Sequence, residues 1–97
     1  MPVVEELFRA LDDRTRRLIL DDLSLRDGQT LFEICTQLNG RHGITSTRQA
    51  ISQHLAVLQA AGLVTTQRHG RSKFHYFDPT PLASITRRWP APPKETS

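Results

Sequence analysis

The sequence predicts a mainly α domain with one β-hairpin, an α+β fold of about five helices. Apolar residues recur at helical spacing in five segments, and capping residues or glycines separate these segments. One stretch rich in threonine and aromatic residues, residues 63–78, instead has the alternation of two short strands around a glycine. We expect one domain over residues 1–89, followed by a Pro-rich and polar tail, residues 90–97, that is disordered.

The first two helices are predicted over residues 3–11 and 14–23. The first has apolar side chains at i, i+3, i+4 and i+7, namely Val4, Leu7, Phe8 and Leu11. Asp12 and Asp13 then lie where a helix cap belongs. The second helix is expected to bury Leu18, Ile19, Leu20 and Leu23, and the turn at 26–28 ends this unit.

Capping signals place the next two helices. Thr30 and Glu33 form a capping-box signature, which predicts a helix over 30–38 that Asn39-Gly40 ends. Ser46 and Gln49 offer a second capping box, and Thr47 is a rival cap one residue along. The helix that follows is expected to reach Ala61, with Gly62 in the left-handed position after it. Its core face consists of Ile51, Leu55, Leu58 and Ala61.

The last part of the chain predicts a hairpin and a short helix. Residues 69–72, His-Gly-Arg-Ser, form the expected hairpin turn. Phe74 and Tyr76 alternate with their neighbours, which predicts one packed side and one partly exposed side. Thr80 and Pro81 begin the last helix, which Pro90 ends. One face of that helix carries Leu82, Ile85 and Trp89.

The helix predicted over 46–61 carries a second face that lacks acids. We call this face the polar stripe; it consists of Arg48, Gln49, Ser52, Gln53, Ala56 and Gln59. Arginine can pair with guanine, glutamine with adenine, and serine with base edges or phosphate. Thr47 and the free amides at the helix start suit a phosphate. The polar stripe therefore indicates a surface that contacts nucleobases.

Positive charge is concentrated in the same part of the chain. The net charge is +3, but residues 1–33 hold eight acids and five arginines, whereas residues 34–77 hold five Lys or Arg, all four histidines and no acid. A basic segment without acids suits a polyanion, because phosphate neutralisation releases counterions. The expected backbone contacts around the hairpin turn are Arg68, His69, Arg71 and Lys73. His54 lies near the apolar face, so packing is its first role and a phosphate contact its second.

The sequence lacks the residues that membrane proteins, secreted proteins and enzymes require. No apolar run approaches the roughly 18 residues that span a bilayer, and no signal-peptide core is present, so a cytoplasmic protein is expected. Adjacent carboxylates at 12–13 and 21–22 diverge by about 100° on a helix and are expected to be caps or solvated side chains. Without a nucleophile motif or a phosphate-binding loop, the chain is predicted to have no catalytic residue and no cofactor.

A capped helix, a connection, a helix with a polar stripe and a basic hairpin together form a helix-turn-helix followed by a wing. Three runs, LDDRTRRLILDDL (11–23), ISQHLAVLQAAGLV (51–64) and RHGRSKFHYFD (68–78), resemble the arsenical-repressor (ArsR) family of winged helix-turn-helix regulators. This resemblance covers about residues 5–89. It implies a homodimeric repressor of a palindromic site on double-stranded DNA, with an interface formed by Leu7, Phe8, Leu11, Leu82, Ile85 and Trp89.

Many members of that family sense metals, and this sequence departs from them. Their thiolate site uses a cysteine pair in the helix that matches 30–38, where this chain has only Cys35. Their second site uses Asp and His on the last helix, and residues 81–89 contain neither. We therefore expect no metal site, a buried structural Cys35, and His42 in a loop. No residue pattern identifies an effector site, and a winged-helix module that binds protein instead of DNA is the alternative function.

Overall fold

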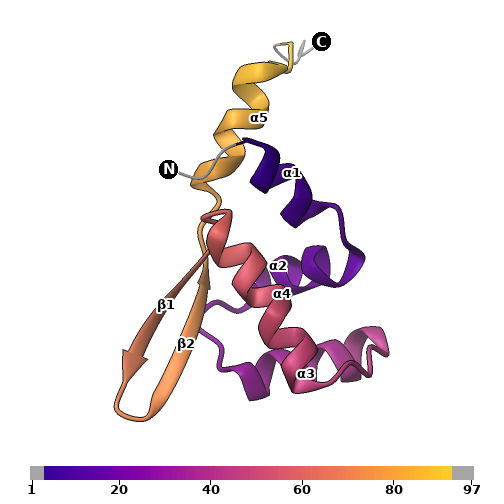
Figure 1. Ribbon diagram of the computed structural model, residues 1–97, viewed down its shortest axis with the longest axis vertical. Coiled ribbons are helices and arrows are strands. Elements are labelled where there is room, and N and C mark those ends of the chain that lie inside the picture. The colour runs from indigo at the N-terminus through magenta and orange to yellow at the C-terminus, as the bar shows by residue number, and fades with distance from the viewer. Residues whose placement is uncertain (1–3, 93–97) are drawn as a thin grey trace, which may run out of the picture.

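Five α-helices and one antiparallel hairpin form the part of the chain that the computed structural model describes, residues 4–92 (Figure 1). α1 and α5 lie toward one end of the molecule, whereas α3 and the hairpin tip lie at the other (Figure 1). The long axis measures 47 Å. The elements are α1 (Val4–Leu11), α2 (Arg14–Leu25), α3 (Leu31–His42), α4 (Arg48–Ala60), β1 (Val64–His69), β2 (Ser72–Phe77), a 3-10 turn η1 (Thr80–Leu82) and α5 (Ala83–Arg88).

Side-chain caps fix the starts of α2, α3 and α4. Asp13 accepts from the Arg16 amide at 3.0 Å, which confirms it as the cap of α2. The predicted capping box of α3 is present, with the Glu33 carboxylate accepting from the Thr30 amide at 3.0 Å. At α4 the cap is Thr47, whose hydroxyl accepts from the Ala50 amide at 3.1 Å. The capping box predicted at Ser46 is wrong, because the rival cap one residue later bonds to the helix instead.

The end predicted for α3 is also wrong. The helix continues through Asn39 and Gly40 to His42, and Gly43, with φ 66°, takes the left-handed position that ends it. Glycine inside a helix costs about 1 kcal/mol relative to alanine, which the added turn can offset through its contacts. His42, expected in a loop, is therefore the last residue of a helix, and its Nε2 donates to the Asp22 carboxylate at 3.1 Å.

The expectation for Asp22 is wrong as well. We expected the Asp21-Asp22 pair to be solvated, yet Asp22 is 3% exposed and joins α2 to the end of α3. The Arg41 guanidinium lies 3.8 Å from the same carboxylate oxygen. A buried carboxylate needs hydrogen bonds and opposite charge, and the last turn of α3 supplies one hydrogen bond and one cation, both at Oδ1. This bond fixes the end of α3 against α2.

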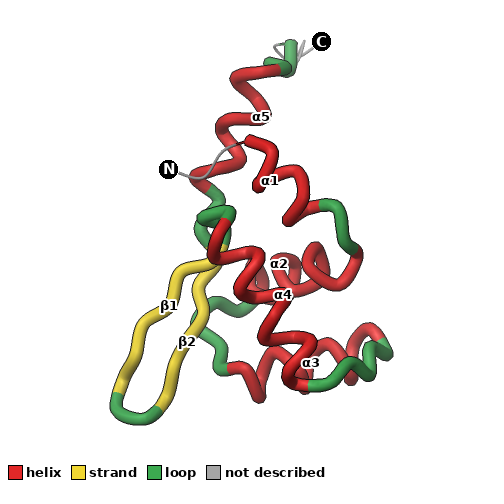
Figure 2. The backbone as a smooth tube through the Cα atoms, in the orientation of Figure 1, coloured by secondary structure: helices red, strands yellow, loops and turns green. Residues whose placement is uncertain are grey.

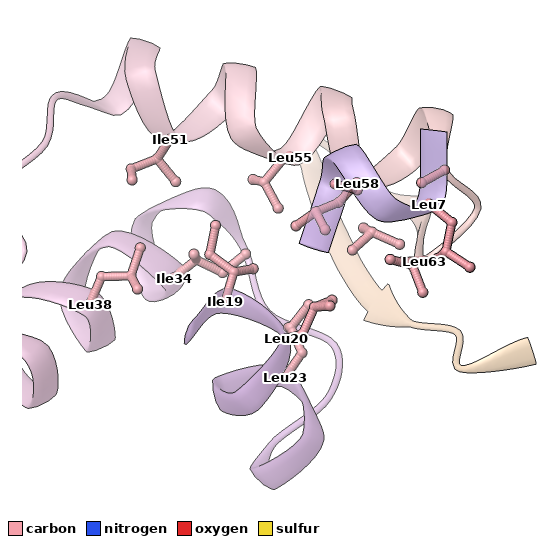
Figure 3. Close-up of a cluster of buried hydrophobic side chains, with 13 residues drawn as sticks. Leu7, Ile19, Leu20, Leu23, Ile34, Leu38, Ile51, Leu55, Leu58 and Leu63 are labelled. Atoms are coloured by element: carbon pink, nitrogen blue, oxygen red, sulfur yellow. The ribbon is translucent and has the colours of Figure 1, made fainter. Parts of the chain in front are cut away.

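The core lies between α4 and the two helices beneath it (Figure 3). Ile51, Leu55 and Leu58 point from α4 toward the buried residues of α2 and α3, as predicted. Those residues are Ile19, Leu20, Leu23, Ile34 and Leu38. Burial of each such side chain contributes roughly 1.5–3 kcal/mol. Cys35 packs against the edge of this cluster and is only partly buried, and its burial raises the pKa of the thiol.

The hairpin follows α4 directly and extends away from the helices (Figure 2). As predicted, Gly62, with φ 77°, ends α4, and the Leu63 amide donates back to the Leu58 carbonyl at 3.0 Å. β1 and β2 pair from Val64 opposite Phe77 to His69 opposite Ser72. Gly70 and Arg71 therefore form a two-residue turn, and the φ of 63° at Gly70 suits the turns that join twisted strands.

The last predicted helix divides into η1 and α5, with Trp89 at the end of α5 as its cap residue. The start predicted for the first helix, residue 3, and most of the predicted tail, residues 93–97, lie outside the described residues. Among the helices of residues 4–92, none has the length and hydropathy needed to cross a membrane.

Candidate nucleic-acid interface

The polar stripe lies on the surface of the molecule. Arg48, Gln49, Ser52, Gln53 and Ala56 are exposed, and Gln59 is half-buried. The opposite side of α4 is filled by Ile51, Leu55 and Leu58, so the core holds the helix in this orientation. Small residues in the middle of the stripe, Ser52 and Ala56, leave room for close approach by another surface.

The first turn of α4 carries a positive charge, which is unfavourable at the start of a helix. It contains Arg48 and no acidic residue. Helix starts carry partial positive charge, so anions stabilise them and cations do not. This arrangement becomes favourable when an anion or an electronegative base edge lies in front of the helix. Thr47, whose side chain caps the helix, is exposed at the same place.

The wing, residues 64–77, is fixed to the turn between α2 and α3. The amide of His75 donates to the Gln29 carbonyl at 2.8 Å, and the Gln29 amide donates back at 3.1 Å. The Phe77 amide donates to the Asp27 carboxylate at 2.8 Å. Gly28 has φ 72°, and a Cβ there would lie 3.0 Å from the Tyr76 ring. This anchor holds the base of the wing, and it includes residues that the sequence alone did not indicate.

His75 is the buried residue of β2, at 5% exposure, and its side chain belongs to the same anchor. Nδ1 lies 2.9 Å from the Gln29 carbonyl oxygen, to which it donates. Burial lowers the pKa of His75, and the charge of Lys73 lowers it further, while the bond to Gln29 acts in the opposite direction. The neutral ring is therefore the stable form in the fold. Phe74 and Tyr76 are half-buried, so the packed face of this strand is the one that carries His75.

A hollow of about 460 Å³ separates α4 from the wing. Ser52 and Gln59 of the polar stripe line one side, and Arg71, Ser72 and Lys73 line the other. The hollow therefore joins the two groups of residues predicted to contact DNA. Its wall holds hydroxyl, amide and cationic groups beside the apolar side chains of Leu31, Phe32 and Leu55. The hydroxyl, amide and cationic groups are of the kinds that bind a phosphate backbone.

The cations of the wing repel one another in the isolated chain. Arg68 and Lys73 are directly opposite in the register, and Arg71 follows in the turn. Like charges in opposite positions destabilise a hairpin, so binding of a polyanion would relieve this cost. His69 is on the other face of the hairpin, where its ring lies 5.7 Å from that of Phe74. The four residues are exposed, but only Arg68, Arg71 and Lys73 form the basic group.

His54 lies between α4 and α2 rather than on the polar stripe. Its Nδ1 is 3.0 Å from the Arg16 guanidinium, which also donates to the Ala10 and Arg9 carbonyls at 2.8 and 2.9 Å. The Asp13 carboxylate is 4.0 Å from the same nitrogen. This environment matches the predicted packing role, and the bond to Arg16 occupies the nitrogen that faces α2. Arg16, which joins α1, α2 and α4, was missed by the sequence analysis.

The residues predicted for a dimer interface lie on and beneath the surface formed by α1 and α5. Trp89 is 58% exposed, and its ring lies 6.0 Å from Phe8, with Arg88 stacked over both rings. Leu82, Ile85 and Leu11 are half-buried against the core. Leu7 is 2% exposed within the single chain, so its side chain offers little surface to a partner.

No three histidine, cysteine, aspartate or glutamate side chains of residues 4–92 come together as metal ligands do. The described α5 also carries neither Asp nor His.

Comparison with known proteins identifies this arrangement. The model of a helix-turn-helix domain matches residues 11–67. An uncharacterized HTH-type transcriptional regulator, YuzN of Bacillus subtilis, is 45% identical over 85 residues, covering 88% of this chain and 92% of the relative. The solved structure of an ArsR-like transcriptional regulator from Rhodococcus sp. RHA1 has a TM-score of 0.75 and 33% identity, with 88% of this chain and 72% of that chain covered. The chain belongs to the ArsR family of winged helix-turn-helix transcriptional regulators.

A second relative, HTH-type transcriptional regulator Rv2034 of Mycobacterium tuberculosis, is 33% identical over 81 residues, which cover 84% of this chain and 69% of the relative. As an ArsR-family protein, this chain is a DNA-binding transcription regulator. In that fold α3 and α4 form the helix-turn-helix, with α4 as its second helix, and the hairpin is the wing.

Proposed function

We propose that this ArsR-family protein is a dimeric, sequence-specific repressor, in which the polar stripe of α4 contacts bases and the wing holds the DNA backbone. One observation carries the proposal: the exposed, acid-free stripe faces the basic wing across a hollow of about 460 Å³. Base contacts are assigned to Arg48, Gln49, Ser52 and Gln53. Backbone contacts are assigned to Thr47, Arg68, Arg71 and Lys73, with His54 and His69 at the margins.

The charge of the surface supports DNA over a protein partner. Arg68, Arg71 and Lys73 form no ion pair with a carboxylate among the described residues. Phosphates can therefore bind these side chains without displacing an internal partner. If each subunit neutralises about four phosphates, log K falls with log salt concentration at a slope of about −7.

Dimerisation through α1 and α5 gives the operator its symmetry. The exposed Trp89 ring beside Phe8 supplies an apolar patch on α5 and α1. The two helices lie away from α3 and the hairpin tip (Figure 1). Two symmetric copies require a palindromic site whose half-sites are roughly 34–36 Å apart or somewhat more. The protein acts in the cytoplasm, without catalysis and without a metal held by the family's known sites.

The experiment is selection of bound fragments from sheared genomic DNA, followed by sequencing. The expected result is a recovered palindrome whose affinity exceeds that of random duplex and whose site represses a reporter gene. Recovery of DNA without a shared sequence would contradict specific reading. Recovery of no DNA at physiological salt would favour the protein-binding alternative.

A further inference from the structure

An aromatic side chain outside α4 contacts the first residue of the polar stripe. Phe32, the second residue of α3, is 62% exposed. The guanidinium of Arg48 lies over its ring, 5.4 Å from the centroid. Single exposed apolar residues are common, so the exposure of Phe32 does not by itself indicate a function. The stacked guanidinium is the observation that matters, because it joins this ring to a predicted base contact.

Phe32 also lines two hollows beside α4. It lines the hollow between α4 and the wing, together with Ser52 and Lys73. It lines as well a second hollow of about 480 Å³ at the start of α4, together with Ser46 and Arg48. The ring therefore lines both hollows and lies next to the first residue of the polar stripe.

Among the described residues, Arg48 forms no ion pair that could orient its guanidinium more strongly than the contact with Phe32. No carboxylate of residues 4–92 lies within ion-pair distance of its guanidinium. A long exposed arginine loses rotamer entropy when it binds a base edge, and prior stacking reduces that loss. Guanidinium groups stack on aromatic faces and keep their in-plane N–H donors free for a guanine edge.

We propose that Phe32 is a positioning residue for Arg48, and that the pair sets the preference for guanine at one base pair in each half-site. This inference rests on the proposed function, because it requires Arg48 to contact a base. A cation–π contact at an exposed site accounts for about a two- to fivefold change in affinity. The change should be largest at that base pair, because the guanidinium of Arg48 is the group of the polar stripe that lies over the Phe32 ring.

The test measures the affinity of the full chain for the selected operator and for every single-base variant of one half-site. F32L keeps apolar bulk but removes the aromatic face, and F32W restores such a face. We expect F32L to lose about two- to fivefold in discrimination at one position, the same position that R48A affects. F32W should retain the wild-type preference. L25A, at another exposed apolar residue, is the matched control and should change nothing.

The double variant F32L/R48A decides whether the two residues act together. If Phe32 acts through Arg48, adding F32L to R48A causes no further loss of discrimination. An equal loss in both backgrounds, or an unchanged preference in F32L, would overturn the inference. A wild-type protein without sequence preference would instead overturn the proposed function, so the two failures are distinguishable.

Discussion

The imidazole of His75 donates from Nδ1 to the Gln29 carbonyl oxygen at 2.9 Å, across 46 residues of sequence. The amide of His75 donates to the same oxygen at 2.8 Å. One backbone carbonyl between α2 and α3 thus accepts two hydrogen bonds from the same residue of the wing. Because α3 also packs against α4, the turn at Gln29 sets the position of the wing relative to the polar stripe.

This anchor makes stability depend on pH. The pKa of His75 in the fold lies below its usual value of 6.5, chiefly because of burial, so the unfolded chain takes up this proton first as pH falls. The contribution of His75 is complete above about pH 6.5 and is lost as pH falls from there toward the folded pKa. H75N can keep a donor near Gln29 but does not titrate. In urea unfolding between pH 7.5 and 5.0, wild type should lose stability relative to H75N, and parallel curves would contradict this.

Gly28 should tolerate alanine worse than Gly43 does. Both have positive φ, 72° and 66°, where alanine costs about 1–2 kcal/mol. A Cβ at Gly28 would also press on the Tyr76 ring at 3.0 Å, whereas nothing lies within 4 Å of a Cβ at Gly43. We therefore expect G28A to reduce the free energy of unfolding more than G43A. Equal losses would show that the contact with Tyr76 is unimportant.

Substitution at Gly40 has the opposite expected sign. This glycine lies inside α3, and a Cβ there would meet no atom within 4 Å. Alanine in its place should stabilise the protein by about 0.5–1 kcal/mol, because it restricts the unfolded chain and favours the helix. Thermal unfolding of G40A measures this. A lower midpoint than wild type would indicate that α3 ends before residue 40 in solution.

The proposed dimer depends on the patch at the end of α5. Replacing Trp89 with aspartate puts a charge into the apolar contact and should yield monomers on a sizing column. Trp89 is a better target than Leu82, which packs against the core of its own chain. L25D, at a residue that is 71% exposed elsewhere, controls for added surface charge. An unchanged elution volume for W89D would remove this interface.

Local signals in the sequence were sufficient for much of the fold. The spacing of Ile51, Leu55 and Leu58 predicted the core face of α4, and the Thr30–Glu33 pair predicted the start of α3. The stop predicted at Gly40 failed because two glycines compete to end one helix. The helix ends at Gly43 instead, because a hydrogen bond between His42 and Asp22, twenty residues apart in the chain, stabilises its last turn.

The parts of the interface that depend on distant contacts were not predictable. The pairing of β2 with Gln29 needs no local motif, because main-chain groups of any residue can form it. The same holds for Arg16, whose donors bind carbonyls of α1 and a histidine of α4. The exposed stripe was predictable because helix periodicity alone separates it from the core.

The division of roles between the polar stripe and the wing is tested most directly by two alanine variants, each measured on the operator and on random duplex. Q49A should lose about 1–3 kcal/mol per half-site on the operator and little on random duplex, because one base contact is removed in each subunit. R71A should weaken both complexes similarly and reduce the salt slope by about 2, because the dimer loses one phosphate contact in each subunit. Equal losses on both duplexes for both variants would contradict the account.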